Sequence, residues 1–175
     1  MKIMQIVRTD EFVRIKHQVG TKIASETRDV TYHEAPLKAF DDALQALAPI
    51  CGNWVGAGAD YGSDVTVRSV TLSFTKSGTK SATIAFKKPL DINDAGLLMS
   101  TPCVQIDEPY ANEDTRRECH KKQAEAIYKL LGHAEDYVNG DRQQMVLPLP
   151  KEKEEPEDGD ALKFPPPEGK KHAHG

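Results

Sequence analysis

The stretch VTVRSVTLSFTKSGTKSATIAFKKPL, residues 65–90, decides the fold class of this 175-residue chain. Apolar and polar residues alternate on both sides of a glycine-containing turn, which is the pattern of two antiparallel strands joined as a β-hairpin. The residues expected on the buried face are Val70, Leu72 and Phe74 before the turn, and Ala82, Ile84 and Phe86 after it. Because the alternation slips between Val67 and Val70, we also predict a β-bulge in the first strand.

Further strands are predicted on both sides of this hairpin. The stretch FVRIKHQV, residues 12–19, alternates strictly, and RDVTYHE, residues 28–34, is the expected return strand. One face of the first of these carries Val13, Ile15, His17 and Val19. Residues 95–106, AGLLMSTPCVQI, predict one more strand, and Pro102 favours an edge position or a break there because proline has no N–H to donate.

Two amphipathic helices are predicted, at residues 35–51 and at about 113–138. The first has an apolar stripe of Leu37, Phe40, Leu44, Leu47 and Cys51. Pro36 suits its first turn, while Pro49 and Gly52 are expected to end it. The second has a stripe of Ala124, Ile127, Leu131, Ala134 and Val138, and Asn139-Gly140 is its stop signal.

The element order β-β-α-β-β-β-α predicts an α+β fold. We expect a mainly antiparallel sheet with both helices packed on one of its faces. Residues 1–149 would form this single domain. The segment 150–175 is dominated by charged residues, proline and glycine, so it cannot bury enough apolar surface to offset its chain entropy and is expected to be a disordered tail.

Composition excludes several classes of protein. The formal net charge of −4 is not that of a strongly basic nucleic-acid binder. Three cysteines at unrelated spacings do not form a disulfide framework, so we expect a reduced, cytoplasmic setting. The charged N-terminus does not resemble a signal peptide, and no segment approaches the roughly 20 apolar residues of a membrane helix, so no membrane partner is expected.

Three stretches carry a resemblance: AFDDALQALAPICGNW (39–54), LLMSTPCVQIDEPY (97–110) and YVNGDRQQMVLPL (137–149). Together they resemble small accessory proteins encoded by tailed bacteriophages and prophages, over about residues 29–149. The resemblance implies an accessory protein acting in the cytoplasm of a bacterial host cell, and it implies no activity. We therefore expect a non-enzymatic binding protein that acts on a replication or host component.

The most specific candidate for partner binding follows the second helix. Gln144, Met145 and Leu147 match the type and spacing of the extended Gln-Leu-x-Leu-Phe peptides that bind bacterial sliding clamps. Met is a flexible apolar residue that can replace Leu, whereas Pro148 stands where such peptides have an aromatic residue. The alternative is that this strip packs back onto its own domain as a final strand.

Nucleic-acid binding is a second hypothesis. Basic residues cluster around the hairpin and at the start of the second helix: Lys76, Lys80, Lys87, Lys88, Arg116 and Arg117. They could form a binding surface for DNA, or they could be solvated lysines that protect the edges of the sheet.

A third hypothesis is a counter-defence protein that inhibits a host nuclease or sequesters a nucleotide signal. Trp54, in the glycine-rich segment 52–64, would be the residue that stacks on the nucleotide. This segment follows a helix and precedes a strand, which is the wrong context for a phosphate-binding loop. Cys119 and His120 are adjacent on a helix and diverge by about 100°, so no metal site and no cofactor is predicted.

Overall fold

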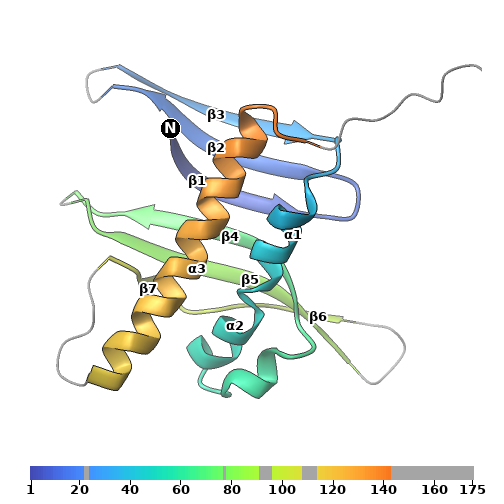
Figure 1. The fold of residues 1–175 in the computed structure, drawn as a ribbon, viewed down its shortest axis with the longest axis vertical. Helices are drawn as coiled ribbons and strands as arrows, with labels where there is room; N and C mark the ends of the chain where they lie inside the picture. The colour runs from blue at the N-terminus through green and yellow to red at the C-terminus, as the bar shows by residue number, and fades with distance from the viewer. Residues whose placement is uncertain (22–23, 77, 91–95, 108–113, 143–175) are drawn as a thin grey trace, which may run out of the picture. The chain divides into compact units, whose positions relative to one another are not determined.

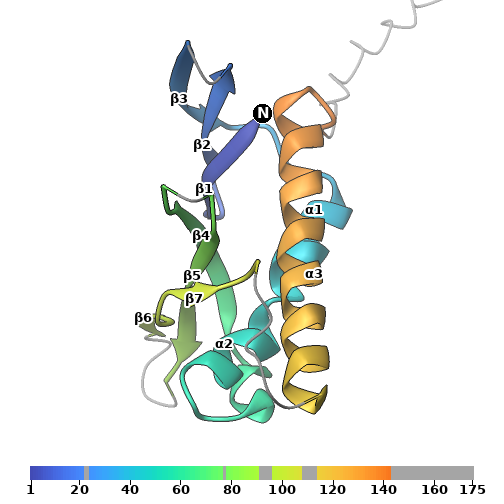
Figure 2. The same ribbon diagram turned by 90° about the vertical axis from the view of Figure 1, so that its left-hand side faces the viewer.

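Helices cover one face of a seven-stranded antiparallel sheet in the computed structural model (Figures 1 and 2), which confirms the predicted α+β class. The structure describes residues 1–21, 24–76, 78–90, 96–107 and 114–142, with the backbone alone for 114–118. Contacts divide the chain into Met1–Met145 and Val146–Gly175. Residues 143–175, which include the predicted tail and the strip that precedes it, lie outside the described residues.

Three strands come first, a helical region separates them from four more, and a long helix follows. The first strands are β1 (Lys2–Arg8), β2 (Val13–Gly20) and β3 (Ser25–Tyr32). The helical region contains α1 (Lys38–Gln45), α2 (Ala48–Trp54) and the short 3₁₀ helix η1 (Ala59–Gly62). The remaining elements are β4 (Thr66–Phe74), β5 (Lys80–Pro89), β6 (Gly96–Ser100), β7 (Val104–Gln105) and α3 (Asp114–Val138). The strand order is β3-β2-β1-β4-β5-β6, and β7 pairs with the other half of β5.

The hairpin at residues 65–90 is present as β4 and β5, and its register changes between Val67 and Ser69, which confirms the predicted bulge. The predicted break around Pro102 is also present, because it separates β6 from β7. Strand β1 was not predicted as a separate element. It carries a bulge of its own between Ile3 and Gln5, and this bulge disrupts the alternation by which a strand is recognised in sequence.

The helical region predicted at residues 35–51 is present, but as two consecutive helices and not as one continuous helix. The chain forms α1 and α2 instead, with Ala46 and Leu47 between them, and α2 runs on to Trp54. Pro49 does not end a helix, because it lies in the first turn of α2, where its missing N–H removes no hydrogen bond. The predicted stripe is still buried, with Leu37 half-buried at its start.

Helix α3 ends where Asn139-Gly140 predicted, and Gly140 adopts the left-handed backbone (φ 110°) that favours glycine. The buried face of α3 is shifted by one residue from part of the predicted stripe. Leu130 and Tyr137 are fully buried, whereas Leu131 and Val138 are only half-buried. Tyr137 is 1% exposed, and its hydroxyl donates a 2.6 Å hydrogen bond to the Glu34 carbonyl.

Glycines in the segment between α2 and β4 allow close packing of its backbone. A Cβ on Gly62 would collide with the carbonyl oxygen of Ala48, and one on Gly52 would collide with that of Gly58. The segment thus folds tightly on itself, which is a structural reason for its glycine content. Gly132 on α3 differs, because a Cβ there would meet no atom within 4 Å.

Two Gly→Ala variants should therefore have opposite effects on stability. Gly62→Ala is expected to lower the free energy of unfolding by about 2 kcal/mol, because the added methyl group overpacks against backbone. Gly132→Ala should raise it by about 0.5–1 kcal/mol, because alanine loses less conformational entropy in a helix. Urea denaturation of both variants measures this, and a loss of similar size in both would contradict the packing of the glycine segment.

The Tyr137 hydroxyl should also contribute to stability. Tyr137→Phe retains the ring but removes the hydrogen bond to Glu34, so we expect a loss of about 1 kcal/mol in unfolding free energy. Tyr32→Phe is the matched control, since the Tyr32 hydroxyl makes no hydrogen bond to a described residue, and it should change stability by less than about 0.5 kcal/mol. Equal losses in the two variants, again by urea denaturation, would argue against this role.

Candidate functional site

One edge of the sheet is formed by β3 and the other by β6 and β7, and β3 is protected by charge. Its side chains are mostly exposed, and they include Glu26, Arg28 and Asp29. Arg28 pairs with Glu26 at 3.0 Å, and Arg14 of β2 forms a bidentate pair with Asp29 at 2.7 and 2.6 Å. Arg14 lowers the pKa of the Asp29 carboxyl through these hydrogen bonds. Charged edge strands discourage pairing with other chains, so β3 is an edge that repels additional strands.

The opposite outer strand, β6, has the reverse character. Its sequence GLLMS contains no charged residue. Leu97 is 49% exposed and Leu98 is 70% exposed, and Leu90, just after β5, is 45% exposed. Leu97 points to the helix side of the sheet and Leu98 to the open side, since their partners on β5 are Lys88 and Lys87. An apolar edge without protecting charge is typical of a strand that pairs with another chain.

The backbone of β6 leaves hydrogen-bonding groups unpaired on its outer side. The Thr101 amide donates to the Ile84 carbonyl at 2.9 Å, which fixes the phase of the ladder between the two strands. Because the direction of these bonds alternates along an antiparallel strand, Met99 and Leu97 direct their polar groups to β5. The amides and carbonyls of Leu98 and Ser100 then point outward, and no described strand pairs with them.

Contacts behind β6 hold this edge in place. Met99 is half-buried, and the Tyr61 hydroxyl donates to its sulfur at 3.4 Å. The Lys88 ammonium lies 4.7 Å from the centre of the Tyr61 ring, donates to the Tyr61 carbonyl at 3.2 Å and pairs with Asp64 at 3.2 Å. Hydrogen bonds from Lys88 and Ser63 lower the pKa of the Asp64 carboxyl. The edge is therefore positioned before any partner arrives.

Lys87 lies on the open side of the same edge. A Cβ on Gly96 would overlap the Lys87 side chain, so this lysine lies across the position that Gly96 leaves vacant. Lys87 forms no ion pair with a described residue. The edge thus combines exposed leucines, outward backbone groups and a lysine that forms no ion pair with a described residue.

The open face of the sheet is mostly polar. Its central positions carry short side chains: Ser69, Thr71, Ser73, Ser81, Thr83 and Ala85. In the seven described strands, every aromatic side chain lies on the helix side, because each pairs with a residue of that side. The open face of these strands consequently offers no aromatic ring on which a base could stack.

The structure does not bring the predicted nucleic-acid-binding lysines onto one surface. Lys80 and Lys88 point to the helix side, where Asp107 (3.8 Å) and Asp64 (3.2 Å) accompany them. Lys87 points to the open side, and Lys76 lies exposed in the turn after β4. Arg116 and Arg117 lie in the part of α3 whose side chains are not described.

The other predicted site residues are placed as follows. Trp54 is half-buried at the end of α2, packs against the core and donates its indole N–H to the Gln123 side chain at 2.9 Å. Gln144, Met145 and Leu147 lie outside the described residues, so the clamp-binding strip stays a prediction. The leucines of β6 were missed as a site, although the uncharged stretch GLLMS beside Pro102 was a usable signal.

The described ranges contain no cluster of metal ligands and no helix that could cross a membrane. No three His, Cys, Asp or Glu side chains there are grouped closely enough to hold a metal ion. His120 is buried, with its Nε2 atom 2.7 Å from the Gln105 carbonyl oxygen. No helix in those ranges combines the length and apolar character needed to cross a membrane.

Comparison of the chain with protein-family models, curated proteins and solved structures finds no match. Function must therefore be inferred from the chemistry of the chain's own surfaces. Among these, the β6 edge combines exposed apolar side chains with outward backbone groups, and we take it as the candidate site.

The three cysteines should differ in reactivity. Burial raises the pKa of the Cys51 thiol to about 12, whereas Cys103 and Cys119 are exposed. Because the thiolate is the reactive form, Ellman's reagent at pH 7 should modify two cysteines in the native protein and the third only after unfolding. The Cys51→Ala variant should show two reactive thiols per chain both before and after unfolding. Rapid modification of three thiols in the native protein would contradict the burial of Cys51.

Proposed function

We propose that the chain is a non-catalytic protein-binding module, and that a partner adds an extended segment to strand β6. The observation that carries this proposal is Leu98, which is 70% exposed on an uncharged edge strand whose backbone groups have no described partner strand. Strand addition supplies main-chain hydrogen bonds for affinity, and alternate side chains of the added segment supply specificity.

The chemistry of the edge defines the segment it fits. Leu97 and Leu98 would contact apolar side chains on the two faces of the incoming strand, while Lys87 would pair with an acidic residue on the open side. We therefore propose an extended, largely apolar segment that carries one Asp or Glu. A second copy of this chain fits less well, because a strand of five residues is small beside the roughly 800 Å² per partner of a stable interface.

The resemblance to phage accessory proteins makes a replication or host protein the expected partner. The strip Gln144, Met145 and Leu147 is a separate route to a partner, and it keeps the bacterial sliding clamp as a specific proposal. These two surfaces can be distinguished because their residues can be changed independently.

Leu98→Lys should abolish strand addition, because it places a charge at the centre of the apolar edge. Peptides selected from a random 12-residue library against the wild-type protein should be largely apolar and contain an acidic residue. In calorimetric titrations, the affinity of these peptides for Leu98→Lys should be at least tenfold lower than for the wild type. Thr27→Lys makes the same change of charge on the opposite edge strand and should leave binding unchanged. Both positions are exposed, so unfolding free energies should shift by less than about 0.5 kcal/mol.

Two results would contradict this proposal. One is that selected peptides bind Leu98→Lys as tightly as the wild type. The other is a monomer–dimer equilibrium in light scattering that Leu98→Lys abolishes, which would assign the edge to self-association. If purified sliding clamp binds the wild type and Leu98→Lys equally, but not a Gln144→Ala, Leu147→Ala double variant, then the strip carries clamp binding and the β6 edge does not.

A further inference from the structure

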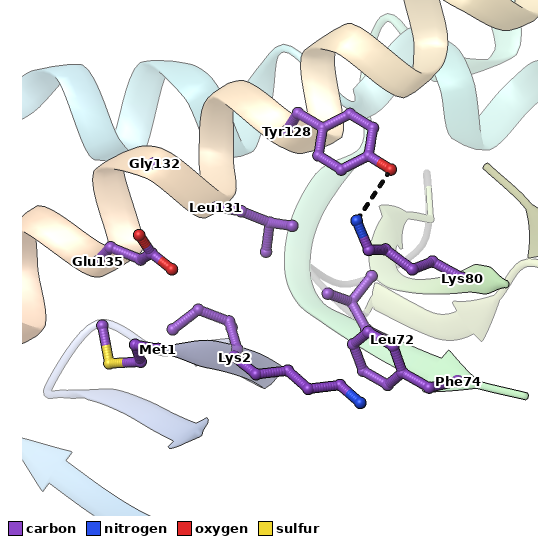
Figure 3. A pocket seen from close by; sticks show the side chains of 10 residues that line it. Met1, Lys2, Leu72, Phe74, Lys80, Tyr128, Leu131, Gly132 and Glu135 are labelled. Atoms are coloured by element: carbon purple, nitrogen blue, oxygen red, sulfur yellow. Dashed lines mark hydrogen bonds between the residues drawn. The ribbon is translucent and has the colours of Figure 1, made fainter. Parts of the chain in front are cut away.

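A cavity of about 340 Å³ lies between α3 and the strands β1, β4 and β5, well away in sequence from the β6 edge (Figure 3). Its apolar wall is formed by Ile3, Leu72, Phe74 and Leu131. Such a volume is at the lower end of the range for small-molecule sites. The apolar lining indicates that the body of an occupant would be apolar.

Gly132 is one reason for the space beside α3. It borders the cavity, and a Cβ at this position would meet no atom within 4 Å. A helix interior normally disfavours glycine by about 0.5–1 kcal/mol relative to alanine. Here the missing side chain leaves open a space that a larger residue at the same position would fill.

The two lysines that line the cavity differ in their partners. The Lys80 ammonium has partners, because Asp107 lies at 3.8 Å and the Tyr128 hydroxyl at 3.4 Å. The Lys2 ammonium lies 3.5 Å from the centre of the Phe74 ring and forms no ion pair with a described residue. Figure 3 shows Glu135 beside Met1, on the opposite side of the cavity from Lys80. The end near Phe74 is therefore the positive end.

We infer that this cavity binds an amphipathic monoanion, which has an unbranched apolar chain and a carboxylate head. The chain would lie against Leu72 and Leu131, and the head would pair with Lys2. A cavity of about 150 Å³ holds benzene, so by proportion this one accommodates up to about fourteen non-hydrogen atoms. A medium-chain carboxylate such as decanoate is within that size. The site is independent of the β6 edge and does not rest on the function proposed for it.

The head-group preference is the decisive test. Decanoate and decylammonium share one chain and differ in the sign of the head, so each is titrated into the full 175-residue protein below its micellar concentration. Decanoate should bind the wild type at least tenfold more tightly than decylammonium does. Lys2→Glu should lower the affinity for decanoate at least fivefold and raise the affinity for decylammonium, because it reverses the charge of the residue that faces the head group.

Variants at Gly132 test the location. Gly132→Phe should lower the affinity for decanoate at least tenfold, because the ring fills the space. Gly132→Ala should keep the affinity for decanoate within twofold of the wild type. Methyl NMR shifts on binding should be confined to Ile3, Leu72 and Leu131 among the described Ile and Leu residues. Equal affinity for the two head groups, shifts centred elsewhere, or no saturable decanoate binding would each overturn the inference. Lys2 is exposed, so Lys2→Glu remains informative if Gly132→Phe fails to fold.

Discussion

The fold depends on one helix that crosses a short junction in the sheet. Strands β1 and β4 meet through three residue pairs, centred on Ile6 and Val70, and this junction joins the N-terminal strands to the C-terminal ones. Helix α3 runs across both groups (Figure 1). At one end, the Tyr137 ring packs edge-on against Tyr32, with 5.2 Å between ring centres. It also packs at a tilt against Phe40, with 5.6 Å between ring centres. Toward the other end, Gln123 accepts the Trp54 indole N–H, and Tyr128 is hydrogen-bonded to Asp107. The helix therefore fixes both halves of the sheet relative to each other.

This arrangement determines where binding surfaces remain. The helices bury the apolar side of the central strands. The other side carries short residues on β4 and β5 and longer polar residues such as Arg14 and Lys16 on β2. The exposed leucines of the described residues lie at and near β6. One edge strand is charged along its length, while β6 exposes leucines on both of its faces. Because one edge of the sheet is protected by charge and the other is not, an added strand is favoured at the unprotected edge only. The cavity beside Gly132 is a consequence of the same helix, because α3 forms one of its walls.

Local patterns predicted much of the fold. The hairpin at 65–90, its bulge, the end of α3 and the break at Pro102 all follow from alternation, periodicity and turn chemistry. Strand β1 was missed because its bulge hides the alternation, and the first helix was divided because Pro49 can begin a helix as easily as end one. Alternation alone also implies that Lys87 and Lys88 face opposite sides of the sheet, so these two lysines do not share one face. The uncharged stretch GLLMS could indicate an unprotected edge, but the exposure of Leu98 also depends on which strand lies beyond β6, and a local pattern does not contain that information.

We infer that α3 holds a rigid junction while the β6 edge stays open for a partner. Native-state hydrogen exchange, read for each amide by NMR in the isolated 175-residue chain, tests both parts at once. Residues 5–7 of β1, paired on both sides, should exchange only through global unfolding, whereas the Leu98 and Ser100 amides should exchange almost as fast as in an unstructured peptide. Adding a selected strand-forming peptide should protect those two amides. Strong protection of Leu98 and Ser100 in the isolated chain would contradict the account, because the edge would then already be occupied.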